Sequence, residues 1–229
     1  MEPAQKMSGR EAILASIRRS LGVSGREAPR RKTVSDRLRE HPEGVVPARG
    51  KLAPSARAEL FRKMVEAAAG TIEEVQRATD VPGAIAAFLR AHNLPMSVRR
   101  GDDPRLEAMP WARERTLEVK RGASDGTDLV AVSHAFGAVA ESGTLVLTSG
   151  KDNPTTLNFL PDTHIVVVDA KDIAGDYETV WRKLRENGAM PRTVNWITGP
   201  SRSADIEQTL ILGAHGPRRL HVMVVGDTE

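Results

Sequence analysis

The sequence predicts an α/β fold built on a mostly parallel sheet with helices packed against it. Runs of apolar residues predict strands, and several of these runs are continuous rather than alternating, which is typical of strands buried on both faces. A helical pattern over residues 173–187 separates two of the runs, and this is the strand–helix–strand rhythm of a parallel sheet. The later strands are expected at residues 129–132, 144–148, 164–168, 193–197 and 220–225.

The first element is a short helix over residues 9–21. Ser8 and Glu11 have the spacing of a capping box, and Gly22 supplies a stop signal. Residues 23–54 carry four prolines and many basic residues without periodicity, so we expect a solvated linker, with docking onto a partner or a second copy as the alternative. The predicted division is therefore an N-terminal arm, residues 1–54, and an α/β domain, residues 55–229.

Strand and helix begin to alternate after this arm. An apolar stripe predicts a helix over residues 55–69, and a second helix is expected from about Pro82 to Asn93. Short strands are expected at residues 71–75 and 96–99.

Composition excludes several classes of protein. The chain of 229 residues has no cysteine, so it can form neither a disulfide nor a thiolate-ligated zinc or iron–sulfur centre of its own. A net charge of only +3 and 3% aromatic residues argue against nucleic-acid binding. No apolar run is long enough to span a membrane, and the N-terminus lacks the apolar core of a signal peptide, so we expect a cytoplasmic protein. Glycine-rich nucleotide-binding motifs are also missing.

The segment from Thr198 to Arg218 carries more polar chemistry than two turns require. Two Gly-Pro pairs are predicted to flank a helix that starts near Ser201, and its free amides together with an arginine would bind an anion. The alternative is a well-capped helix, because acidic residues already compensate its dipole. His215, in a glycine-rich loop, is a tentative catalytic residue. The expected anion-binding residues here are Thr198, Gly199, Ser201, Arg202, Ser203, Asp205, Gly216 and Arg218.

A second polar cluster opens the strand at residues 144–148. Glu141 precedes a turn made by Ser142 and Gly143, and Thr144 begins the strand. Ser142, Gly143 and Thr144 are expected to take part in binding the substrate or anion. A carboxylate at a strand mouth can act as a general acid or base, or as a nucleophile toward an activated acyl group. The alternative is that Glu141 braces the turn. No spacing typical of a metal site accompanies either cluster, so no metal is expected.

Four ordered blocks resemble the LUD-domain family, in its lactate-utilisation protein C branch. They are Ala140–Leu145, Asn158–Pro161 with His164 following, Thr198–Glu207 and Gly213–Arg218. The resemblance covers roughly residues 60–229. The family's usual threonines are replaced by Ser142 and Ser203, which keep a hydroxyl group.

The resemblance implies a three-layer α/β/α sandwich similar to the NagB, ribose-phosphate isomerase and CoA-transferase group. It also implies a role beside iron–sulfur proteins in the oxidation of L-lactate to pyruvate, and the absence of cysteine fits a cluster-free subunit. The polar cluster around Arg202 adds a small carboxylate or phosphate as the expected ligand. Two alternatives remain at this stage. One is an independent CoA-transferase-like or sugar-phosphate enzyme that uses Glu141, and the other is a structural or regulatory partner protein. A homo-oligomer is a further possible assembly.

Overall fold

The protein is described here from a computed structural model that covers residues 8–204, 210–213 and 215–226. It divides into two compact units, Met1–Val45 and Val46–Glu229. None of the described helices is long and apolar enough to cross a bilayer.

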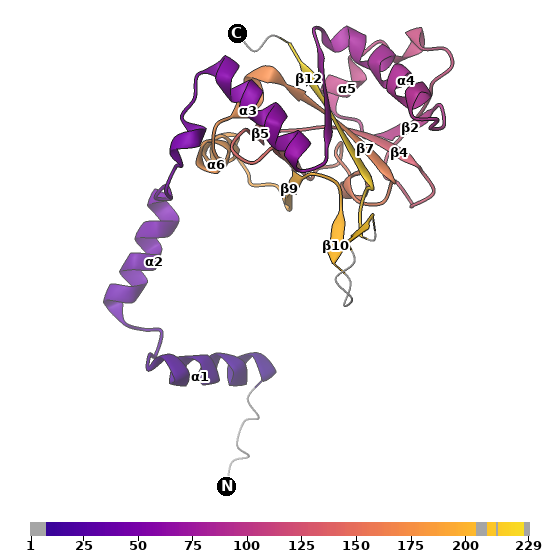
Figure 1. Cartoon of the computed structure of the whole chain (residues 1–229). Coiled ribbons are helices and arrows are strands. Elements are labelled where there is room, and N and C mark those ends of the chain that lie inside the picture. The colour runs from indigo at the N-terminus through magenta and orange to yellow at the C-terminus, as the bar shows by residue number, and fades with distance from the viewer. Residues whose placement is uncertain (1–7, 205–209, 214, 227–229) are drawn as a thin grey trace. The chain divides into compact units, whose positions relative to one another are not determined.

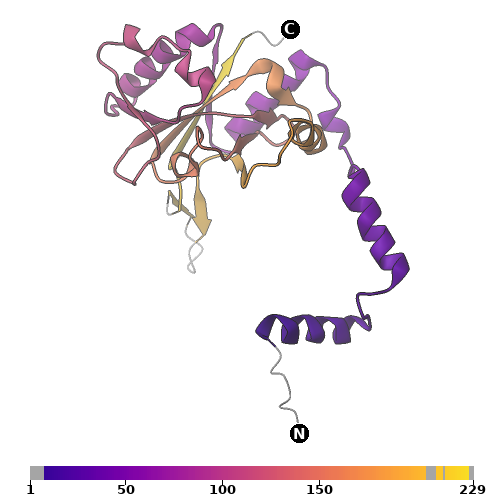
Figure 2. The same ribbon diagram turned by 180° about the vertical axis from the view of Figure 1, so that it is seen from behind.

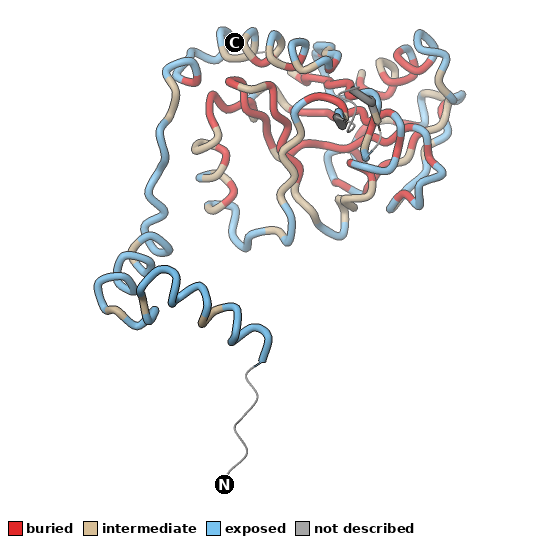
Figure 3. Tube along the Cα trace, turned by 60° about the horizontal axis from the view of Figure 1, so that its bottom comes forward, coloured by how far each residue is buried: buried red, intermediate tan, exposed pale blue. Residues whose placement is uncertain are grey.

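The N-terminal unit holds two helices, α1 (Gly9–Leu21) and α2 (Ala28–Glu40). The predicted capping box of α1 is confirmed, because the hydroxyl of Ser8 accepts from the Glu11 amide and the Glu11 carboxylate accepts from the Ser8 amide. The expectation of an irregular linker over residues 23–54 is wrong for α2. Local ion pairs such as Lys32–Asp36, at 2.7 Å, support this helix instead of an apolar stripe, so hydrophobic periodicity could not reveal it. Both helices are exposed along nearly their whole length (Figure 3).

The main unit is built around a parallel sheet of six strands in the order β1-β12-β7-β4-β2-β3. Its central strands lie side by side in Figure 1. The α/β class with a mostly parallel sheet flanked by helices is thereby confirmed. The strands are β1 (Thr71–Val75), β2 (Ser97–Arg100), β3 (Glu118–Arg121), β4 (Val130–His134), β7 (Thr163–Asp169) and β12 (Arg219–Val225).

Alternating residues of the central strand β7 divide the core between the two faces of this sheet. Ile165 and Val167 pack with α4 (Val81–Ala91) and with the region of α5 (Pro104–Glu107). Val166 and Val168 pack with α3 (Pro54–Ala67) and with a second sheet. The continuous apolar run of β7 therefore serves two cores, as expected for a strand that is covered on both sides.

The second sheet has four strands in the order β8-β5-β6-β9 and mixes parallel and antiparallel pairs. Its strands are β5 (Gly137–Val139), β6 (Thr144–Thr148), β8 (Ile173–Ala174) and β9 (Val194–Thr198). Two of the apolar runs expected in the main sheet, β6 and β9, lie here. A further core covers this sheet with helix α6 (Tyr177–Glu186), whose N-cap Asp176 accepts from the Thr179 amide at 2.8 Å.

The predicted helix between the two Gly-Pro pairs is wrong. Strand β10 (Arg202–Ala204) instead pairs antiparallel with β11 (Leu210–Leu212), and β10 projects from the body of the main unit in both views (Figure 1, Figure 2). Backbone bonds at the base of this hairpin explain the difference, because Ser201 N donates to Pro217 O and Gly213 N donates to Ser201 O. These non-local bonds draw the two loops together and override a weak local helix preference.

Candidate functional site

A cavity of about 300 Å³ lies beside the first residues of β7 and β12. It therefore opens at the amino ends of these parallel strands, whereas open α/β sheets usually bind ligands at the carboxyl ends. Six of the residues expected to bind an anion or act in catalysis line it together: Thr198, Gly199, Ser201, Arg202, His215 and Gly216. The remaining walls include Asn158, Phe159, His164, Trp196, Ile197 and Leu220.

The two loops that form the cavity mouth are held together by their backbones. Ser201 donates its amide to Pro217 O at 2.9 Å and accepts from the Gly213 amide at 3.0 Å. Gly199 has a φ of +74°, and a Cβ atom there would lie 2.3 Å from the carbonyl oxygen of Ala68 at the end of α3. Only glycine fits this approach, so the mouth is fixed against the helix below it.

The charge of the cavity wall favours an anion. Arg202 and His215 are exposed side chains at the mouth, and no aspartate or glutamate occurs among the described lining residues. A guanidinium group can bind a carboxylate or a phosphate through two parallel hydrogen bonds. The predicted anion site is therefore supported by charge, although the helix terminus that was expected to supply amides is absent from the described residues.

The inner wall contains a hydrogen-bonded row of buried polar side chains that the sequence did not predict as site residues. His164 is 0% exposed, and its Nε2 lies 2.9 Å from the Ser133 hydroxyl, which donates to Asn158 Oδ1 at 3.4 Å. Burial lowers the pKa of His164 to about 3, so the ring is neutral near pH 7. The sequence did carry a signal for this pair, because Ser133 and His164 interrupt two apolar strands. Buried polar side chains need hydrogen-bond partners, so such interruptions point to a polar contact in the interior.

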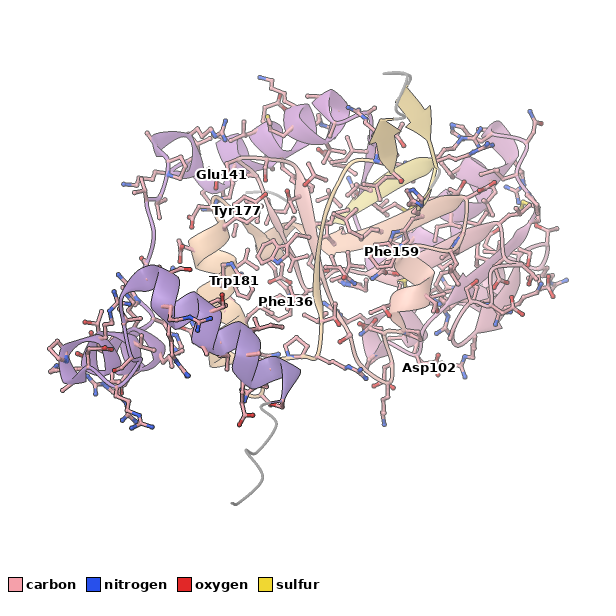
Figure 4. The ribbon with its side chains drawn as sticks, turned by 90° about the horizontal axis from the view of Figure 1, so that it is seen from below. Asp102, Phe136, Glu141, Phe159, Tyr177 and Trp181 are labelled. Carbon is pink, nitrogen blue, oxygen red and sulfur yellow. The ribbon has the colours of Figure 1, made fainter. Side chains whose placement is uncertain are left out.

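Glu141 and its turn lie outside this cavity. Figure 4 shows Glu141 close to Tyr177 and well separated from Phe159, which lines the cavity wall. The Glu141 side chain is only 5% exposed, and its Oε2 lies 3.7 Å from Nε of Arg49 and accepts no hydrogen bond. The backbone amide of Glu141 donates to Gly175 O at 3.2 Å. A buried carboxylate beside an arginine fits a bracing role better than the role of an exposed nucleophile.

The other residues of the turn form a cluster of hydroxyl groups. Thr144 Oγ1 lies 2.8 Å from Ser142 Oγ, 2.9 Å from the Tyr177 hydroxyl and 2.6 Å from Thr198 Oγ1. Thr198 also lines the cavity, so this cluster connects the Glu141 turn to the cavity mouth. Gly143 has a φ of +66° and packs against the backbone of α3.

The remaining candidates separate from this site. Arg218 lines a neighbouring cavity of about 410 Å³ together with Asp162 and Arg219. Ser203 lies in β10, and Asp205 falls outside the described residues. No group of three or more histidine, aspartate or glutamate side chains suited to a metal ion occurs in the described part of the chain.

Comparison with known proteins identifies the family. The LUD domain model matches residues 58–225. The chain is 34% identical over 148 residues to lactate utilization protein C from Geobacillus thermodenitrificans, which covers 55% of this chain and 61% of that protein. It is 41% identical over 93 residues to the protein of the same name from Bacillus subtilis, covering 39% of each.

A solved structure supports the same assignment. A protein of the DUF162 family from Deinococcus radiodurans is 27% identical, with a TM-score of 0.58, and the match covers 76% of this chain and 99% of that one. The matches to the two lactate utilization proteins span less than two thirds of their length. The family model covers most of the main unit, including both sheets. This chain belongs to the LUD domain family.

Proposed function

We propose that this chain is a cluster-free subunit of an L-lactate utilisation system and that it binds the carboxylate of the substrate in the 300 Å³ cavity. The observation that carries the proposal is the placement of Arg202 and His215 at the mouth of a cavity without a described acidic wall residue. The name shared by several relatives, lactate utilization protein C, supplies the substrate.

Partner proteins are needed for the redox chemistry. Oxidation of lactate to pyruvate releases two electrons and two protons, and the chain has no cysteine to hold an iron–sulfur cluster. We assign the electron acceptors to iron–sulfur partner proteins. In this assignment the chain binds and orients the acid, and it carries no cofactor of its own.

Glu141 has a supporting role in this proposal. Its burial and its contact with Arg49 hold the turn that presents Thr144 to Thr198. A CoA-transferase reaction requires the carboxylate to attack an acyl thioester, and a side chain that is 5% exposed is poorly placed for that attack. The CoA-transferase alternative is therefore less favoured.

The test is binding of L-lactate by calorimetry, followed by lactate-dependent dye reduction in a mixture with the purified partner proteins. Arg202→Ala should weaken lactate binding by about 10- to 150-fold, because a hydrogen bond to a charged group contributes about 1.5–3 kcal/mol. Arg219→Ala is the matched control, since this exposed arginine lines the neighbouring cavity. The lactate affinity of this variant should stay within about twofold of wild type. Unchanged affinity in folded Arg202→Ala would remove the cavity mouth from the binding site, and full dye reduction without this chain would refute the subunit role.

A further inference from the structure

The inner wall of the cavity contains hydrogen-bonding groups that the carboxylate-binding mouth does not use. Asn158 and His164 both line the cavity, and their residues are 6% and 0% exposed. Ser133 lies behind them and is absent from the lining of this cavity; with Asn158 it lines a second, very small one. Asn158 and His164 thus line the cavity, and Ser133 contacts both of them from the side away from it.

The hydrogen bonds among Ser133, Asn158 and His164 determine which of their polar atoms remain available to a ligand. A serine hydroxyl has one proton, and that of Ser133 is donated to Asn158 Oδ1. With the Ser133 proton on Asn158 Oδ1, Nε2 of His164 donates the hydrogen bond to Ser133 at 2.9 Å, and in this tautomer Nδ1 is an acceptor.

Neither remaining group has a partner in the described part of the chain. Nδ1 of His164 is buried without a hydrogen bond. The Oδ1 end of Asn158 is engaged by Ser133, which leaves its NH2 end as a donor. A buried polar atom without a partner costs about 1–3 kcal/mol, so such atoms in a cavity wall call for an explanation.

We propose that Asn158 and His164 form a subsite that recognises the 2-hydroxyl group of a small 2-hydroxycarboxylate, with Ser133 as the positioning residue. This inference rests on the proposed function, because Arg202 binds the carboxylate at the mouth. A hydroxyl group both donates and accepts, so it satisfies the Nδ1 acceptor and the amide donor together. A methylene group in its place satisfies neither. Nδ1 is covered from water, so this subsite requires a local shift of the inner wall when the acid binds.

The neutral state of His164 suits this role. Because burial holds its pKa at about 3, the ring stays uncharged throughout the neutral range, and in the tautomer with the proton on Nε2 the lone pair of Nδ1 is available. The subsite therefore adds no charge to the cavity and discriminates by hydrogen bonding alone. A site built to bond a hydroxyl rejects an analogue that lacks it, because its own polar groups then stay unpaired.

The experiment compares L-lactate with propionate, which has the same carbon chain without the hydroxyl group, by calorimetry on the full chain. Wild-type protein should bind L-lactate about tenfold or more tightly than propionate. His164→Phe should bring this ratio to about one while the propionate affinity stays within about twofold. His221→Phe is the matched control, because His221 is also a buried histidine but stacks on Phe88 and is not among the residues that line the cavity. The lactate-to-propionate affinity ratio of this variant should match that of wild type.

Asn158→Leu is the second variant and removes the donor without touching the histidine. It should also lower the lactate-to-propionate ratio, which keeps the inference testable if His164→Phe fails to fold. Equal binding of the two acids by wild type, or an unchanged ratio in folded Asn158→Leu or His164→Phe, would overturn the hydroxyl subsite and leave carboxylate binding intact. Failure of wild type to bind either acid would refute the proposed function and the subsite together.

Discussion

Acidification from pH 7.5 to pH 5 should destabilise the main unit through its buried histidines. Burial lowers the pKa of His164 from 6.5 to about 3, and burial followed by the nearby His92 lowers that of His221 to about 4. His134 shifts in the same direction, through burial first and then the charge of Arg105. The rings of His164 and His221 are neutral in the folded protein at pH 5, whereas the same rings in the unfolded chain are protonated.

The direction and the size of the stability change follow from this difference in bound protons. Between pH 6.5 and the folded pKa the unfolded state holds the extra proton, so the free energy of unfolding falls as the pH falls. One pH unit corresponds to about 1.4 kcal/mol, and pH 5 lies about 1.5 units below the unfolded pKa. His164 and His221 should each contribute a loss of about 2 kcal/mol, or about 4 kcal/mol together.

Urea unfolding followed by circular dichroism at pH 7.5, 6.5, 5.5 and 5 provides the measurement. The free energy of unfolding should be nearly flat above pH 7 and should decline below pH 6.5. His221→Phe should remove about 2 kcal/mol of the difference between pH 7.5 and pH 5, whatever its effect on absolute stability. Equal stability at the two pH values in wild type would show that these histidines are protonated in the folded state and would refute the reasoning.

Three further predictions concern the turn and the N-terminal unit. Gly143→Ala should lower the melting temperature strongly, because its Cβ would lie 2.6 Å from the backbone carbon of Met64 at a φ of +66°; a melting temperature within a degree or two of wild type would show that α3 yields easily. Glu141→Gln should trap no acyl adduct and should impair the reconstituted complex, and a hydroxylamine-sensitive adduct at wild-type Glu141 would restore the CoA-transferase alternative. Deletion of residues 1–45 should leave the main unit cooperatively folded, because neither helix in the deleted segment has a buried residue. The same deletion should weaken association with partner proteins. Loss of cooperative unfolding in the truncated chain would contradict the independence of the main unit.

The sequence alone determined the elements whose signals are local. The capping box at Ser8 fixed the start of α1, and the stop at Gly22 fixed its end. Continuous apolar runs located β4, β6, β7 and β12 within a residue or two, because burial on both faces leaves a pattern that needs no knowledge of neighbours. Strand β9 was also located within one residue, although its residues are only half-buried or exposed. The density of polar residues around the two Gly-Pro pairs also predicted a site there, and six of the predicted residues line one cavity.

Only the tertiary structure decided how these elements combine. Apolar runs do not say which strands pair, so β6 and β9 were expected in the main sheet and lie in the second. The hairpin of β10 and β11 depends on bonds between Ser201 and residues more than ten positions away, which local propensity cannot register. The same holds for the inner wall of the cavity: Ser133 and His164 are 31 residues apart and meet only because β4 and β7 are neighbours. Caps, turns and buried strands can be predicted from neighbouring residues in the sequence. Contacts between distant side chains depend on strand order and register, which the sequence pattern does not give.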